Sequence, residues 1–203
     1  EVGTILNYAQ ECGIDTLDTA IAYGESEAVL GRHGVGQWKT ITKLPEVPDD
    51  CKDVTRWVND QLLQSLNRLR VPQLYGLLLH RPAQLLEQKG PALYDALLGA
   101  QSQGITHKIG LSVYGPTELD AVLDRYTFGL VQAPLNILDR RMVESGWVKC
   151  LSEAGVEVHA RSAFLQGLLL MPAERRPIRF NRWKRTLQIW DDWLSKAGLT
   201  PLQ

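Results

Sequence analysis

Four side chains that could together reduce a carbonyl group occur within the first 80 residues of the chain. Asp18 and Tyr23 come at the end of one short apolar run, and Lys43 comes near the end of the next. His80 directly follows a third apolar run. The four residues are of complementary chemical type, so they are the first candidates for a shared active site.

Hydride transfer to a carbonyl creates an alkoxide that must be protonated, so such a site needs a general acid. Tyr23 could donate the proton, and the ammonium group of Lys43 would stabilise the phenolate that remains. A carboxylate such as Asp18 would keep the lysine charged and in position. His80 would donate a hydrogen bond to the substrate oxygen and orient it.

Each of these residues also has an ordinary structural interpretation. An aspartate at a strand end often caps a turn, a lone tyrosine often packs half-buried, and a loop histidine often hydrogen-bonds to the backbone. Lys43 differs, because a lysine within an apolar run must either enter a site or extend its charged end to solvent. The combination on three consecutive strands favours one shared site.

The elements that must position these residues follow a regular pattern. Short apolar runs alternate with segments of helical spacing, which is typical of repeated βα units around a parallel sheet. We expect strands at Thr16–Ala20, Lys39–Leu44, Leu74–Leu79, His107–Val113, Gly129–Ala133 and Val156–Ala160. We expect the principal helices at Val54–Leu69, Pro91–Gln103, Met142–Ala154 and about Asn181–Ala197.

No linker or low-complexity segment interrupts this pattern, so a single domain is expected. The two candidate architectures are an open doubly wound sheet and a (β/α)8 TIM barrel. The first strand is followed by IAYGESE and not by a GxGxxG phosphate loop, which favours the barrel. A barrel needs eight strands and about 250 residues. We therefore expect an incomplete α/β barrel with about six of eight βα units, lacking the first strand and the last strand–helix unit.

Further polar side chains lie at the carboxyl ends of the later strands, where barrel active sites form. Ser112 ends the fourth strand, Gln132 and Asn136 follow in the fifth, and Arg161 and Ser162 end the sixth. Gln132 and Asn136 could also simply cap strand ends, and Arg161 could pair with an acidic residue. These alternatives are open at the level of sequence.

The composition indicates a small-molecule partner. With a formal net charge of -1, 44% hydrophobic and 22% charged residues, the chain offers no global attraction for nucleic acid or for an anionic membrane. The three cysteines form no CxxC pair and the histidines have no metal-ligand spacing, so no metal is expected. A cytoplasmic location is expected, since no membrane span or signal peptide is evident. The oligomeric state is open.

The stretch GIDTLDTAIAYGESEAVLG closely resembles the aldo-keto reductase signature DTA-x-x-YG-x-SE. The segments TKL, LLLH, KIGLSVY, LVQAPLN and HARSAFLQGLLL follow it in the family's order, so the resemblance covers residues 1–203. It implies a TIM barrel that uses NADPH, or else NADH, to reduce an aldehyde or ketone to an alcohol without metal. The substrate would be a small carbonyl compound, with an aldose-like one as a candidate.

The same resemblance implies roles for individual residues. Tyr23 would be the general acid, His80 would orient the carbonyl, and Asp18 and Lys43 would support Tyr23. Asn136 would line the substrate site with Tyr23 and His80. The cofactor would be held by Asp18, Ser112, Gln132, Arg161, Ser162, Leu165 and Gly167.

The chain departs from the family at two positions that relatives use to bind the cofactor. Val113 stands where relatives commonly have an asparagine that binds the nicotinamide carboxamide, and Arg161 stands where many have an aromatic ring. A guanidinium plane can stack on a ring, so Arg161 is interpreted as a stacking or phosphate-contacting variant. The alternative function is a non-catalytic, nucleotide-binding or regulatory protein of the same fold.

Overall fold

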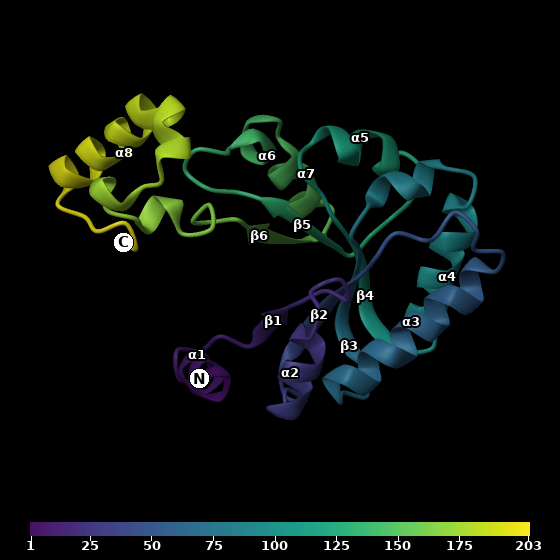
Figure 1. The fold of residues 1–203 in the computed structure, drawn as a ribbon. Helices are drawn as coiled ribbons and strands as arrows, with labels where there is room; N and C mark the ends of the chain where they lie inside the picture. The colour runs from purple at the N-terminus through teal and green to yellow at the C-terminus, as the bar shows by residue number, and fades with distance from the viewer.

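The computed structural model describes residues 1–203 and contains one sheet of six parallel strands in sequential order, β1-β2-β3-β4-β5-β6. The sheet curls into an open half-barrel, consistent with part of a TIM barrel (Figure 1). The strands are β1 (Thr16–Asp18), β2 (Lys39–Leu44), β3 (Leu74–Leu79), β4 (Thr106–Ser112), β5 (Leu130–Pro134) and β6 (Glu157–Arg161). The expected α/β architecture and the six strands are confirmed.

Helices connect successive strands and cover the convex face of the sheet (Figure 1). The α-helices are α1 (Val2–Glu11), α2 (Ser26–Arg32), α3 (Val54–Leu69), α4 (Gly90–Ser102), α5 (Thr117–Leu123), α6 (Arg141–Glu144), α7 (Trp147–Glu153) and α8 (Lys184–Ala197). The 3-10 helices are η1 (Pro82–Leu86), η2 (Leu168–Leu170), η3 (Ala173–Arg175) and η4 (Ile178–Trp183). No helix combines the length and the apolar composition that crossing a bilayer requires.

The main core of 28 buried residues lies between these helices and the outward side chains of the strands. Strand side chains alternate between two faces. In β3, for example, Leu77 and Leu79 belong to this core, whereas Leu78 belongs to a separate cluster on the inner face. The core therefore fixes which residues of each strand point into the half-barrel.

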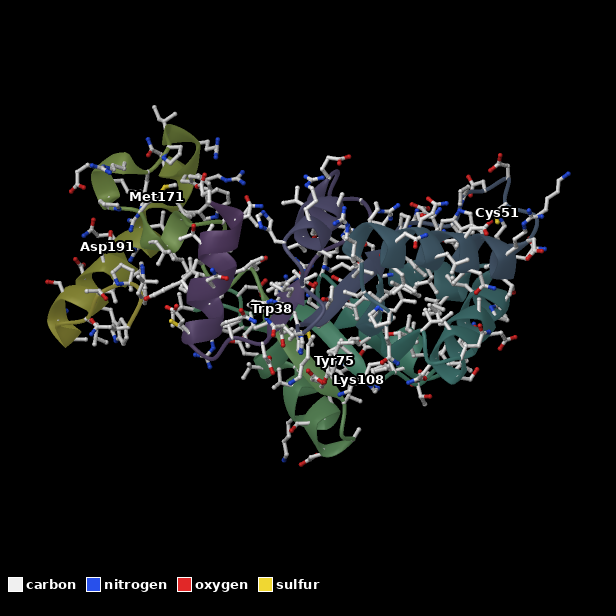
Figure 2. All side chains as sticks on the ribbon, turned by 90° about the horizontal axis from the view of Figure 1, so that it is seen from below. Trp38, Cys51, Tyr75, Lys108, Met171 and Asp191 are labelled. Carbon is white, nitrogen blue, oxygen red and sulfur yellow. The ribbon has the colours of Figure 1, made fainter.

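The inner face is built in three levels along the strands. At the amino ends lies a polar group in which Glu157 accepts hydrogen bonds from Tyr75 at 2.6 Å and from Lys108 at 2.5 Å. Figure 2 shows Tyr75 and Lys108 side by side. A small apolar level of Ile41, Leu78 and Leu130 follows, and polar residues lie at the carboxyl ends. The inward residues of the segment KTITKL follow these levels, with Lys39 at the amino end, Ile41 in the apolar level and Lys43 near the carboxyl end.

Three side-chain contacts join strands that are not neighbours in the sheet, and two of them span at least three strand spacings. Gln132 on β5 donates to Asp18 on β1 at 2.8 Å, and Tyr75 on β3 donates to Glu157 on β6 at 2.6 Å. A flat sheet would hold these strands several strand spacings of about 4.8 Å apart. The two contacts therefore belong to the curled form of the sheet, one at each end of the strands.

Two expected helices differ from the structure. The segment Met142–Ala154 forms two short helices, α6 and α7, because Gly146 adopts a φ of 83° that a continuous helix does not allow. The last helix begins at Lys184, since the residues before it form η4.

The segment from η2 to the carboxyl end forms a separate small lobe (Figure 1). Leu187 and Trp190 of α8 pack against Leu168 and Leu169 in a cluster of their own, outside the main core. In Figure 2 the labelled residues Met171 and Asp191 mark this lobe, which lies away from Tyr75. The helix α8 thus packs on the segment that precedes it.

Candidate active site

The loop between β1 and α2 carries Tyr23. Asp18 is the last residue of β1, and the Thr19 amide still donates to the Ile41 carbonyl at 2.9 Å, so pairing with β2 continues past the strand end. The Tyr23 amide donates to the Ala20 carbonyl at 3.0 Å, and the Tyr23 carbonyl accepts from the Ser26 amide at 3.1 Å. These turns bring Tyr23 back over the carboxyl end of the sheet.

Lys43 forms the fixed centre of the group. Its side chain is only 1% exposed, and its Nζ donates to both carboxylate oxygens of Asp18 at 2.8 Å. A third hydrogen bond, also 2.8 Å, goes to the Thr19 carbonyl. All three ammonium protons therefore have acceptors, which compensates for removing the charge from water.

Tyr23 and His80 stand next to this ion pair. The Lys43 Nζ lies 5.2 Å from the centroid of the Tyr23 ring, and the Tyr23 and His80 rings meet edge to face with centroids 5.9 Å apart. Tyr23 is 49% exposed, whereas Lys43 is buried beneath it. The four side chains expected to share a site do lie together, with Tyr23 and His80 nearer the solvent.

Burial is the first influence on the proton affinities of three of these groups. It lowers the pKa of Lys43, although the adjacent Asp18 carboxylate opposes that change. It also lowers the pKa of His80, and the positive charges of Lys43 and Arg161 lower it further. Burial and then the Asp18 charge raise the pKa of Tyr23. At neutral pH the site therefore presents a protonated phenol and a neutral imidazole.

Ser112 and Gln132 extend the polar group across the inner face. The Ser112 hydroxyl donates to Gln132 Oε1 at 3.2 Å, and Gln132 Nε2 donates to Asp18 Oδ1 at 2.8 Å. Both residues are buried. Gln132 thus contacts the proposed catalytic group directly, and its side chain does not act as a cap at the end of its own strand.

Arg161 has no carboxylate partner among its contacts. Its guanidinium lies 4.6 Å from the centroid of the Tyr114 ring and donates to the Val113 carbonyl at 2.8 Å. Its Nη1 is 3.5 Å from the Ser162 hydroxyl, and its Nε is buried without a hydrogen-bond partner. The guanidinium therefore stacks on a ring of the protein itself, and one of its donors is left unsatisfied.

Asn136 organises the loop after β5. Its Oδ1 accepts from the backbone amides of Leu138 and Asp139, both at 2.9 Å, and its Nδ2 donates to the Ser162 carbonyl at 3.2 Å. This side chain ties the β5 loop to the loop after β6. These contacts fit the alternative in which Asn136 caps the end of its strand. Its contact with substrate stays a prediction.

The loop after β6 has an unusual backbone. Ser162, Leu165 and Gln166 have φ values of 58°, 47° and 54°, and Gly167 has a φ of 87°. Such a run of left-handed residues is uncommon outside glycine and marks a loop held by its surroundings. The loop borders a cavity of about 680 Å³ whose other walls come from the β5 loop, η4 and α8. Ser162 and Leu165 line this cavity.

Glu27 is a buried residue beside the site that was not among the candidates expected from the sequence. This glutamate is 1% exposed and accepts hydrogen bonds from Thr42 at 2.7 Å, Ser65 at 2.5 Å and the Arg68 Nε at 2.7 Å. The only signal in the sequence was its place in the GESE segment, next to Tyr23. A glutamate is rarely buried unless other residues pair with it. Those partners lie on other elements and could not be identified from sequence.

A profile of the aldo/keto reductase family matches residues 1–203. This chain belongs to the aldo/keto reductase family. No curated protein matches the chain closely enough to be compared with it.

Solved structures of other aldo-keto reductases share the fold. The glycerol dehydrogenase from Gluconobacter oxydans superposes with a TM-score of 0.73 at 21% identity, over 98% of this chain and 69% of its own. The holo form of an aldo-keto reductase from Bacillus halodurans gives 0.70 at 23% identity, over 87% and 60%. A protein from Pseudomonas aeruginosa described as an aldo-keto reductase gives 0.68 at 22%, over 83% and 68%. At these identities the likeness establishes the fold alone.

Proposed function

We propose that this family member reduces a small aldehyde or ketone to an alcohol with NADPH, or alternatively NADH, using Tyr23 as the general acid. The observation that carries the proposal is the placement of Tyr23 and His80 beside the buried Lys43 and its ion pair with Asp18. A lysine that is 1% exposed and fully hydrogen-bonded is costly to place, and a site that needs its charge accounts for it.

The residues at the carboxyl ends of the strands fit a dinucleotide. The Gln132 amide has both a donor and an acceptor, which matches the carboxamide of a nicotinamide, and Ser112 adds a hydroxyl beside it. Arg161 offers a buried Nε without a partner. We expect Asp18, Ser112, Gln132 and Arg161 to hold the nicotinamide end, with Ser162, Leu165 and Gly167 along the loop that follows.

When bound, the reduced dinucleotide would supply the hydride that the carbonyl carbon accepts. The side chains supply the rest of the chemistry. His80 donates a hydrogen bond to the carbonyl oxygen and orients it, and the Tyr23 hydroxyl transfers its proton to that oxygen. The positive charge of Lys43 then stabilises the phenolate, while Asp18 keeps Lys43 in place. Tyr23 regains its proton from solvent, to which it is half exposed.

The proton affinities support these roles. The neutral imidazole of His80 can donate one N–H without competing with Tyr23 as an acid. The raised pKa of Tyr23 keeps its proton in place until the oxygen becomes strongly basic. An alkoxide is such a base, so the proton moves as the hydride arrives.

The test combines binding and turnover. NADPH is titrated into the protein while its fluorescence is followed, and the reduction of an activated aldehyde is then assayed with wild type and Tyr23→Phe. We expect both proteins to bind NADPH and only wild type to turn over rapidly. Binding by both with equal, slow turnover would contradict the catalytic proposal and support the non-catalytic nucleotide-binding alternative.

A further inference from the structure

Glu27 is a buried carboxylate with no part in the chemistry described above. It lies in the first turn of α2, four residues after Tyr23, and is only 1% exposed. Burying a carboxylate is unfavourable unless strong hydrogen bonds replace its hydration. Its contacts therefore show which parts of the structure it holds together.

The contacts of Glu27 join three elements. Its Oε1 accepts from Thr42 on β2 at 2.7 Å and from Ser65 on α3 at 2.5 Å. Its Oε2 accepts from the Arg68 Nε on α3 at 2.7 Å, and the Arg68 Nη2 lies at the same distance. The start of α2 is thereby bound to both the neighbouring strand and the neighbouring helix.

The contact between Glu27 and Thr42 on β2 links the anchor to the active site, because Thr42 directly precedes Lys43. The two side chains point to opposite faces of β2, Thr42 outward to Glu27 and Lys43 inward to Asp18. A displacement of α2 relative to β2 would therefore change the position of Tyr23 relative to Lys43. Few residues lie between the anchor and the phenol.

Two other contacts restrain the same segment. The Thr19 and Ser26 hydroxyls are 2.9 Å apart and close the loop that carries Tyr23. At the far end of α2, a Cβ added to Gly31 would lie 2.0 Å from the Arg68 carbonyl, so only glycine allows this approach to α3. The helix thus has a glycine contact at its end and the Glu27 contacts at its start.

We propose that Glu27 is a positioning residue for Tyr23, which it holds over Lys43 and His80 by anchoring the start of α2 to β2 and α3. This inference rests on the proposed catalytic function of Tyr23. Glu27 itself touches neither Lys43 nor His80 and acts only through the loop. Loss of the anchor should lower turnover with little effect on substrate binding.

The test uses Glu27→Gln, Thr42→Val and a matched control, Glu157→Gln. In Glu27→Gln the amide oxygen can still accept from Arg68, but the charge that pairs with the guanidinium is lost. The amide nitrogen then faces the Thr42 and Ser65 hydroxyls, which must change from donating to accepting. Thr42→Val removes one donor and keeps the carboxylate, and it decides the question if Glu27→Gln does not fold. Glu157 also accepts three side-chain hydrogen bonds, but at the opposite ends of the strands.

The first readout is the titration of Tyr23 by carbon-13 NMR, with its signal assigned from Tyr23→Phe because the chain has 6 tyrosines. Burial raises the pKa of Tyr23, so a displaced Tyr23 should titrate closer to 10.0. We expect this change in Glu27→Gln, a smaller one in Thr42→Val, and none in Glu157→Gln. The second readout is kcat, which should fall about 100-fold in Glu27→Gln with KM nearly unchanged.

The possible outcomes separate the two proposals. A lower melting temperature with unchanged Tyr23 titration and unchanged kcat would overturn the positioning role and leave Glu27 a purely structural residue. If Tyr23→Phe turned over as fast as wild type, the catalytic proposal would fail. The titration of Tyr23 would still confirm or refute the anchor in that case, because it does not depend on turnover.

Discussion

At the level of single residues, the main feature of the candidate site is a buried positive charge beneath a half-exposed phenol. Lys43 would lose its proton more easily if burial acted alone, and Asp18 opposes this by direct hydrogen bonds. Arg161 adds a second positive charge that lowers the pKa values of Lys43, His80 and Tyr23. The proton affinities of the site are therefore coupled, and changing one charge should shift the others.

Lys43→Met tests this coupling at His80. Removing the ammonium charge should raise the pKa of His80 toward 6.5, although burial, which lowers it most, remains. NMR titration of the His80 ring measures the shift. Lys39→Met is the matched control, since Lys39 lies on the same face of β2 at its other end and pairs with Asp15 at 2.7 Å. An unchanged His80 titration in Lys43→Met would contradict the proximity of the two groups.

Arg161→Met tests the second charge. Because Arg161 lowers the pKa values of Tyr23, Lys43 and His80, its removal should raise all three. The acidic limb of a pH–rate profile that depends on neutral His80 should therefore move to higher pH. Arg161→Lys keeps the charge but loses the planar contact with Tyr114, so its profile should stay close to that of wild type. Equal shifts in both variants would point to the loss of stacking.

At the level of elements, the helix α3 provides the firmest support for the site, because its residues Ser65 and Arg68 bind Glu27. Asp53 caps the start of the helix, where its side chain accepts from the Arg56 amide at 2.9 Å, and Arg70 caps the end with a φ of 55°. Between these ends, Val54, Val58, Leu62 and Leu69 are buried. Helical spacing is a local signal, and it predicted both boundaries of the helix correctly.

Asp53→Ala tests the cap. Loss of the side-chain acceptor at a helix start should lower the free energy of unfolding by about 1 kcal/mol. Urea unfolding followed by circular dichroism measures the change. Asp60→Ala in the same helix is the control, because its ion pair with Arg56 is exposed and 3.9 Å long, so it should change stability by no more than about 0.5 kcal/mol. Equal losses in both variants would show that the cap contributes nothing specific.

Other elements show where local signals fail. The hydrophobic spacing from Met142 onward is continuous, yet Gly146 breaks the segment into α6 and α7. A glycine in a helical pattern is tolerated in many helices, so the sequence alone did not indicate the break. The partners of α8 were equally hidden, because an amphipathic helix shows that one face is buried without showing against what.

At the level of the whole molecule, the open half-barrel is curled, and polar contacts cross its concave side at both ends. At the amino ends of the strands, Glu157 accepts the side-chain hydrogen bonds that form these contacts. Burial opposes its ionisation, but hydrogen bonds from Lys108, Tyr75 and His159 lower its pKa from 4.5 to about 2. A carboxylate whose pKa is lower in the folded protein than in the unfolded chain stabilises the fold above the unfolded pKa.

Glu157→Gln tests this contribution. The stabilisation from Glu157 is fully present above about pH 4.5 and is lost as the pH falls toward 2. It amounts to at most about 3 kcal/mol. Thermal unfolding of the variant should therefore depend less on pH between these limits than unfolding of wild type. Parallel pH profiles for the two proteins would contradict the role of Glu157 as the acceptor that joins β6 to β3 and β4.

The sequence by itself determined the βα order, the boundaries of β2, α3 and β3, and the candidates Asp18, Tyr23, Lys43 and His80. These depend on local spacing and on the rule that carboxyl ends of parallel strands meet at one edge. Only the tertiary structure decided which side chains are hydrogen-bond partners. Gln132 reaches Asp18 across 114 positions, and Glu27 binds Arg68 across 41, because the curl of the sheet and the packing of α2 on α3 bring them together. Such contacts arise from long-range packing, which no local pattern records.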